Sequence, residues 1–217
     1  MARMKIAVLI SGRGSNLQSL IDAARGPGYP AEIVLVVSNV PEVHGLKRAE
    51  MAGIPTAVIN HKDYAGRAPF EDALHNVLVK AEVELVCLAG FMRLLTDGFV
   101  DRWHDRLINI HPSLLPAFKG IHVHERIVEA GVRVSGCTVH FVRPAMDEGP
   151  IIVQAAVPVL PGDNADTLAA RVLAQEHRLY PLAVRLIAEG RARVDGARVA
   201  LDGVTPVEAA FISPCEK

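Results

Sequence analysis

The sequence lacks a charge excess, paired cysteines and long apolar runs, and each absence excludes a class of protein. Its 217 residues carry 23 Lys and Arg against 24 Asp and Glu, a formal net charge of −1. Proteins that wrap nucleic acid need a surplus of cations against the phosphates, so this balance argues against such a partner. No apolar run approaches the roughly 18 residues that a membrane helix needs. We therefore expect neither a nucleic-acid nor a membrane partner.

The cysteines also lack the pattern of a disulfide framework. Cys87, Cys137 and Cys215 are odd in number and widely spaced, which is typical of reduced thiols. Near the N-terminus, Lys5–Ile10 leads directly into a glycine-rich turn and not into a cleavable apolar segment. Half of the residues are hydrophobic. These features predict a cytoplasmic protein that folds as a single domain over residues 1–217.

Short apolar runs alternate with segments of helical spacing in the first half of the chain. The expected strands are Lys5–Ile10, Ile33–Val37, Thr56–Ile59, Leu85–Leu88 and Leu107–Ile110. Continuous apolar runs of this length are typical of buried parallel strands. The pattern predicts an α/β fold, an open and mostly parallel twisted sheet with helices on both faces.

The second half of the chain has a different character. Ser113–His124 reads as a long irregular stretch, and two longer β-rich runs follow at Val134–Val142 and Ile151–Val159. One long helix is expected over Thr167–Ala188, interrupted or kinked by Pro181. An Asp-Gly pair inside the last apolar run predicts a C-terminal hairpin.

The segment Ser11–Asn16 lies between an expected strand and an expected helix. Its glycines allow a tight turn, and the amides at the helix start favour a phosphate. The dinucleotide fingerprint fails because Leu17 stands where the third glycine is required. The alternative is an ordinary turn in which Ser15 or Asn16 caps the helix.

Asn109 and His111 flank Ile110 at the end of an expected strand, so both side chains leave the same face. An amide donor beside an imidazole suits acyl transfer, although a histidine at such a position is often structural. Asp147 lies in a turn between two β-rich runs and becomes functional only if the turn places it beside His111. His122 and His124 lack the further ligands of a zinc site, so we interpret their segment as a loop.

Five segments stand together in the order of one known family. They are Ser11–Gln18, Leu88–Arg93, the NIHPSLLP motif Asn109–Pro116, Asp147–Pro150, and Gln175–Pro181. The chain resembles the phosphoribosylglycinamide formyltransferases over about residues 4–202. The resemblance implies a Rossmann-like formyltransferase fold and transfer of a formyl group from 10-formyltetrahydrofolate to the amine of glycinamide ribonucleotide, without a metal. It also implies a phosphate-binding half at about residues 1–110 and a folate-binding, catalytic-loop half at about residues 111–202.

The resemblance further implies the site residues. Asn109, His111 and Asp147 match the catalytic triad. The residues that match the ribonucleotide site are Gly14, Ser15 and Asn16 for the phosphate and Glu176 for the glycinamide end. The residues that match the folate site are Arg67, Met92, Arg93, Leu94, Leu95, Asn109, Arg143, Met146 and Asp147. The expected partners are these small molecules, and the expected assembly is a monomer or homodimer.

Three alternatives share part of this pattern. A formyltetrahydrofolate deformylase is expected to carry a regulatory domain ahead of the first strand, yet Lys5 already begins that strand. A methionyl-tRNA formyltransferase is expected to carry a further C-terminal domain and more positive charge. A folate- or nucleotide-binding module without catalysis is harder to reconcile with the presence of Asn109, His111 and Asp147 together.

Overall fold

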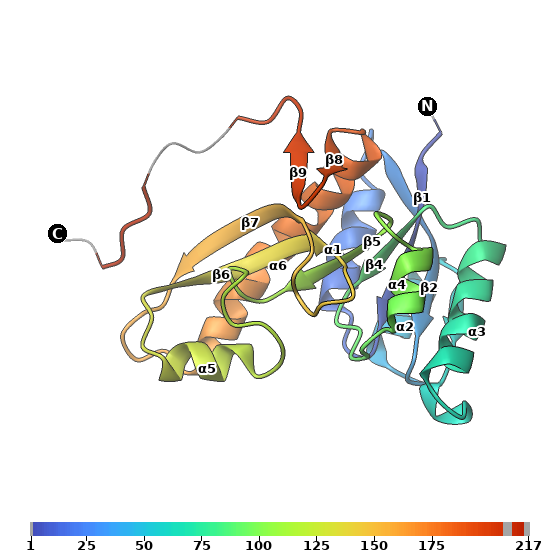
Figure 1. Cartoon of the computed structure of the whole chain (residues 1–217), viewed down its shortest axis with the longest axis horizontal. Helices are drawn as coiled ribbons and strands as arrows, with labels where there is room; N and C mark the ends of the chain where they lie inside the picture. Colours follow the sequence, from blue (N-terminus) through green and yellow to red (C-terminus); the bar gives the residue numbers. More distant parts are fainter. Residues whose placement is uncertain (1, 206–209, 215–217) are drawn as a thin grey trace.

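The computed structural model describes residues 2–205 and 210–214, and within them a seven-stranded sheet forms the centre of the molecule (Figure 1). Its strands run in the order β3-β2-β1-β4-β5-β6-β7. The bounds are β1 Met4–Ile10, β2 Ala31–Ser38, β3 Thr56–Val58, β4 Leu85–Leu88, β5 Leu107–His111, β6 Val134–Phe141 and β7 Ile151–Pro158. Strands β1 to β5 pair in parallel, and β6 and β7 pair antiparallel. The predicted mostly parallel sheet is confirmed.

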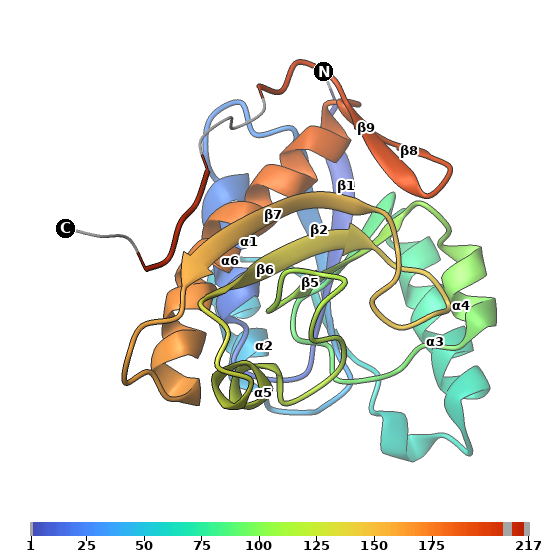
Figure 2. The same cartoon turned by 60° about the vertical axis from the view of Figure 1, so that its left-hand side comes forward.

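Helices cover both faces of this sheet, as predicted (Figure 2). Their bounds are α1 Ser15–Ala24, α2 His44–Met51, α3 Arg67–Lys80, α4 Asp97–Arg102, α5 Val123–Glu129 and α6 Ala165–Ala188, with a short 3-10 turn at His61–Asp63. One core lies between the sheet and α1, α2, α5 and α6, and the other lies under α3 and α4. The alternating faces of the strands divide between these two cores, which explains why their apolar runs are continuous.

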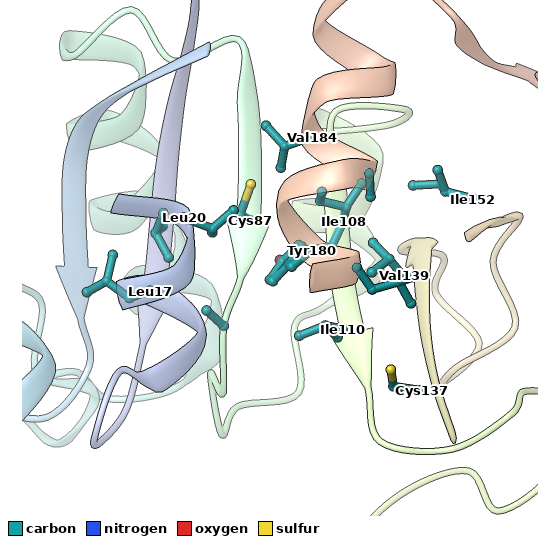
Figure 3. Close-up of a cluster of buried hydrophobic side chains, with 14 of the residues drawn as sticks. Leu17, Leu20, Cys87, Ile108, Ile110, Cys137, Val139, Ile152, Tyr180 and Val184 are labelled. Carbon is teal, nitrogen blue, oxygen red and sulfur yellow. The ribbon is translucent and has the colours of Figure 1, made fainter. Parts of the chain in front are cut away.

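The larger core holds α6 against the ends of β4 and β5. Figure 3 shows Tyr180 and Val184 of α6 packed beside Cys87 and Ile108. Burial of each large apolar side chain contributes about 1.5–3 kcal/mol. The Tyr180 hydroxyl also donates a hydrogen bond to the Leu88 carbonyl oxygen at 2.9 Å. This contact fixes α6, and the side chains on the same helix, relative to the carboxyl edge of the sheet.

Two local predictions need correction. The interruption expected at Pro181 is wrong, because α6 runs without a break to Ala188. The buried contacts of Tyr180 and Val184 outweigh the one helical hydrogen bond that proline cannot donate. The kink stays a prediction. The loop expected at residues 122–124 ends early, because α5 begins at Val123 and buries Val123 and Ile127 on one face. Helix α4 was not predicted. The expected C-terminal hairpin is confirmed as β8 Ala192–Asp195 and β9 Arg198–Leu201.

The described cysteines, Cys87 and Cys137, are free and buried. Cys215 lies outside the described residues. In residues 2–205 and 210–214, no helix combines the length and the apolar character that crossing a membrane requires.

Candidate active site

A cavity of about 630 Å³ opens at the carboxyl ends of β4 and β5. Open parallel sheets bind their ligands at this edge, near the point where the strand order reverses. Here the reversal falls between β1 and β4, because the chain runs from β1 outward to β3 and then returns to β4. Asn109, His111 and Asp147 all line the cavity.

The turn after β6 places Asp147 directly beside His111. The Asp147 Oδ2 atom lies 3.5 Å from His111 Nδ1, and the two side chains are only 10% and 6% exposed. Asp147 has a φ of 56°, a left-handed conformation that aspartate tolerates better than most residues. Its Oδ2 also accepts a hydrogen bond from the Gly120 amide at 2.9 Å. The carboxylate is therefore held from two sides and faces the imidazole.

The second nitrogen of His111 contacts the loop that follows β5. His111 Nε2 lies 2.9 Å from the Phe118 carbonyl oxygen. A carbonyl oxygen can only accept, so Nε2 carries the proton in this contact. His111 thus has a proton on the nitrogen remote from Asp147, and that proton is held by a backbone group of the loop.

Sequence reasoning missed a fourth polar member of this cluster, His140 of β6. It is 2% exposed and pairs across the sheet with Asn109. Its Nδ1 donates to the Phe141 carbonyl oxygen at 3.0 Å, which leaves Nε2 to accept from the Asn109 amide at 3.3 Å. His140 therefore orients the Asn109 amide. The available signal was a histidine inside a run that the sequence predicts to be a strand.

Burial lowers the pKa of His140, and the nearby His111 lowers it further, while the Phe141 carbonyl and Asp147 oppose the shift. A neutral imidazole is the form that can accept from Asn109. Below the ordinary histidine pKa of about 6.5, His140 becomes protonated in the unfolded chain, whereas in the folded chain it stays neutral down to its lowered pKa. The stability contribution of His140 is therefore present above this value and is lost as the pH falls through the folded pKa.

We expect the free energy of unfolding to decrease as the pH falls from 7 to 5, and to decrease less steeply in His140→Gln. Urea unfolding across this range measures the slope, and the imidazole C–H resonance of His140 reports its pKa directly. Replacement of the exposed His44 by Gln is the control and should leave the slope as it is. An equal slope in His140→Gln and the unmodified protein would contradict a buried, neutral His140.

The glycine loop before α1 ends in a left-handed glycine at the start of the helix. Gly14 is the N-cap residue of α1 with a φ of 70°, so neither Ser15 nor Asn16 caps the helix. The Asn16 side-chain amide instead donates to Glu176 Oε2 of α6 at 2.7 Å. The structure therefore brings together Asn16 and Glu176, two predicted ribonucleotide-site residues that are remote in sequence.

Both members of this pair are buried. Asn16 is 9% exposed and its Oδ1 atom has no hydrogen-bond partner. Burial raises the pKa of Glu176, and the donated hydrogen bond from Asn16 opposes this shift. The Asn16 Oδ1 atom and the Glu176 carboxyl group are thus buried polar groups beside the glycine loop. Hydroxyl or amide groups of a ligand could form hydrogen bonds with them.

Helix α2 supports the glycine loop, and sequence reasoning missed this contact between α2 and the loop. The Gly45 amide donates to the Gly12 carbonyl oxygen at 3.0 Å, and Arg48 Nε donates to the Arg13 carbonyl oxygen at 3.0 Å. A Cβ atom on Gly14 would lie 2.7 Å from the Gly45 Cα atom. The close approach of α2 therefore requires glycine at both positions.

We expect Gly14→Ala to lower the free energy of unfolding by about 1–3 kcal/mol, because it combines a left-handed backbone with a backbone clash. Gly12→Ala is a matched control, since nothing lies within 4 Å of a Cβ atom placed there. Urea unfolding of both variants measures the difference. Equal stability of the two variants would contradict the proposed packing of α2 on this loop.

The predicted folate residues divide into two groups. Those that line the cavity are Met92, Arg93, Leu94, Leu95, Asn109, Arg143, Met146 and Asp147. Arg143 also forms an ion pair with Asp105 at 2.5 Å. Arg67 begins α3, is exposed and is not among the lining residues. In the described parts of the chain, no group of three or more His, Cys, Asp or Glu side chains is arranged to hold a metal ion.

Fold and site together define an α/β protein with an amide–imidazole–carboxylate cluster at the ligand-binding edge of its sheet. The sequence model of the family described as formyl transferase matches residues 4–184. The chain therefore belongs to the formyl transferase family.

Individual relatives agree with this assignment. The trifunctional purine biosynthetic protein adenosine-3 of Gallus gallus is 54% identical over 90% of this chain, which spans 19% of that protein. The phosphoribosylglycinamide formyltransferase of Escherichia coli is 42% identical, with coverage of 92% of this chain and 94% of the relative. The crystal structure of glycinamide ribonucleotide transformylase 1 from Symbiobacterium toebii superposes with a TM-score of 0.90 at 47% identity, covering 92% of this chain and 94% of that one.

Proposed function

We propose that this protein transfers the formyl group of 10-formyltetrahydrofolate to the amine of glycinamide ribonucleotide, a step of purine biosynthesis. The observation that carries the proposal is the placement of Asp147 Oδ2 3.5 Å from His111 Nδ1, in the cavity that Asn109 also lines. Similarity over 92% of this chain and 94% of a phosphoribosylglycinamide formyltransferase supports the choice of substrates.

The reaction needs a proton acceptor, a proton donor and a site for developing negative charge. The amine nitrogen attacks the formyl carbon, and charge builds on the formyl oxygen. The Asn109 amide and protonated His111 stabilise that oxygen. Asp147 faces His111 Nδ1 and takes the amine proton through water. The bond from the formyl carbon to the folate nitrogen then breaks, and His111 protonates that nitrogen.

This chemistry requires His111 to exchange one contact. Its Nε2 proton is donated to the Phe118 carbonyl oxygen, 2.9 Å away. When substrates bind, the formyl oxygen or the leaving nitrogen replaces Phe118 as the acceptor. The segment at residues 113–122 then rearranges around the substrates, as long functional loops commonly do.

The two substrates occupy the two halves of the site in this proposal. Gly14, Ser15 and Asn16 hold the ribonucleotide phosphate with the amides at the start of α1. Glu176 contacts the glycinamide end. On the other side, Met92, Arg93, Leu94, Leu95, Arg143 and Met146 hold the folate, and Arg67 contacts its outer part.

A comparison of formyl acceptors tests the function. Purified protein is incubated with 10-formyltetrahydrofolate and either glycinamide ribonucleotide, water alone or charged initiator tRNA. We expect consumption of the formyl donor only with glycinamide ribonucleotide. Formate release without an amine acceptor would instead identify a deformylase, and formylation of the tRNA would identify a tRNA formyltransferase. No consumption with any acceptor would identify a binding module.

We further propose that residues 1–217 act as a single formyltransferase domain in the cytoplasm, as a monomer or homodimer, without a metal. The free thiols of Cys87 and Cys137 suit a reducing compartment.

A further inference from the structure

The segment at residues 91–95 connects β4 to α4 along the predicted folate side of the cavity. Met92 and Leu94 are 69% and 65% exposed. Within the described chain, residues 91–95 form no backbone–backbone hydrogen bond, so neither a helix nor a strand ladder determines their conformation. Four of these five residues are predicted to contact the folate. Something else has to fix this backbone.

One end of the segment is held by Ser11, the first residue after β1. Its hydroxyl oxygen accepts a hydrogen bond from the Met92 amide at 2.8 Å and donates to Asn39 Oδ1 at 2.5 Å. Asn39 follows β2 and is 2% exposed. Because a peptide unit is planar, fixing the Met92 N–H also fixes the direction of the Phe91 carbonyl.

The other end is held by Glu71, which is on α3 and 3% exposed. Its Oε1 atom accepts from the Thr96 amide at 2.8 Å, and its Oε2 atom accepts from the Thr96 hydroxyl. Thr96 is in turn the N-cap of α4. A buried carboxylate therefore fixes the residue at which the segment ends.

We propose that Ser11 and Glu71 are positioning residues that set the backbone of residues 91–95 from its two ends, and thereby set the affinity for the folate. Neither residue lines the cavity, so both act through the segment and not by contact with the ligand. Ser11 stands three positions before Gly14, so the same turn that carries the predicted phosphate loop also supports the folate side. This inference rests on the proposed function.

Amide hydrogen exchange in the ligand-free protein tests the anchors without reference to activity. Loss of one hydrogen bond from a protected amide is expected to accelerate exchange of Met92 about 5- to 10-fold in Ser11→Ala. Ser11→Thr keeps the hydroxyl and should exchange as the unmodified protein does. Glu71→Gln keeps the shape and one acceptor, and Thr96 should exchange faster in it. Unchanged exchange at Met92 in Ser11→Ala would overturn the inference.

Calorimetric titration with 10-formyltetrahydrofolate and, separately, with glycinamide ribonucleotide tests the consequence for binding. We expect the folate Kd to rise about 5- to 20-fold in Ser11→Ala and Glu71→Gln, with the ribonucleotide Kd within about twofold. The stability control is Thr167→Ala, which removes the capping box of α6. It should lower the melting temperature and leave both Kd values unchanged.

The outcomes separate this inference from the proposed function. If the unmodified protein binds the folate but transfers no formyl group, the function is wrong, while the Kd values still decide the role of the anchors. If Ser11→Ala and Glu71→Gln bind the folate as tightly as the unmodified protein, the positioning role is overturned. Equal weakening for both ligands, in parallel with lost stability, would also overturn it, because it indicates a structural role only.

Discussion

Replacement of His111 by alanine is expected to lower kcat by about three orders of magnitude, within the range that general acid–base catalysis contributes. The imidazole is proposed to stabilise the formyl oxygen and to protonate the leaving nitrogen, and alanine can do neither. Ribonucleotide binding should persist, because the proposed ribonucleotide residues Asn16 and Glu176 hydrogen-bond to each other and not to His111. Steady-state kinetics measures kcat, and calorimetry measures ribonucleotide binding.

Two further variants separate the loss of the imidazole chemistry from misfolding and from the loss of any histidine. His111→Gln fills more of the space that the buried ring occupies, so a similar loss of kcat in a folded His111→Gln separates chemistry from misfolding. Replacement of the exposed His104 by alanine is the control for loss of a histidine and should leave kcat unchanged. Turnover of His111→Ala within about tenfold of the unmodified protein would exclude the proposed role.

Asp147→Asn is expected to lower kcat by about 100- to 1000-fold with both substrates still bound. Asparagine keeps the size of the side chain and an oxygen that can accept from the Gly120 amide. It removes the negative charge that faces His111 Nδ1 and the group proposed to take the amine proton. The loss should therefore appear in kcat and not in substrate affinity.

The neighbouring Glu148 provides the matched control. It is 54% exposed and forms an ion pair with Lys119 at 2.7 Å, a kind of contact that contributes little. Glu148→Gln removes the same charge one position along the chain, and kcat should stay within about twofold. Equal effects of the two substitutions would show that kcat depends on the total charge of the turn and not on the contact between Asp147 and His111.

The loop after β5 contacts the proposed catalytic residues through its backbone groups. The Phe118 carbonyl holds His111, and the Gly120 amide holds Asp147. Both contacts come from one irregular segment, so a movement of this segment changes the partners of both side chains together. Substrate entry and the release of His111 from Phe118 are therefore expected to occur in one rearrangement.

The sequence predicted the elements whose signal is local. Strand β1 was predicted from a continuous apolar run, and the hairpin at β8 and β9 from a turn pair between apolar residues. The glycine loop was recognised because its residues are contiguous. By contrast, α5 was missed because Val123 and Ile127, the two residues that stabilise it, do so only by packing against the core. Periodicity over one helical turn is too short a signal to reveal this.

The sequence by itself determined the fold class and the choice of side chains that we propose as reactive, because alternation and motif order are properties of neighbouring residues. Only the tertiary structure placed Asp147 beside His111, His140 behind Asn109, and Glu176 beside Asn16. It also brought Ser11, Asn39 and Met92 together from three separate strand ends. These contacts join residues that are distant in the chain, and their distances depend on the packing of the whole sheet and its helices. A net charge near zero argues only against polyanionic partners, whereas this packing determines where the proposed phosphate site lies.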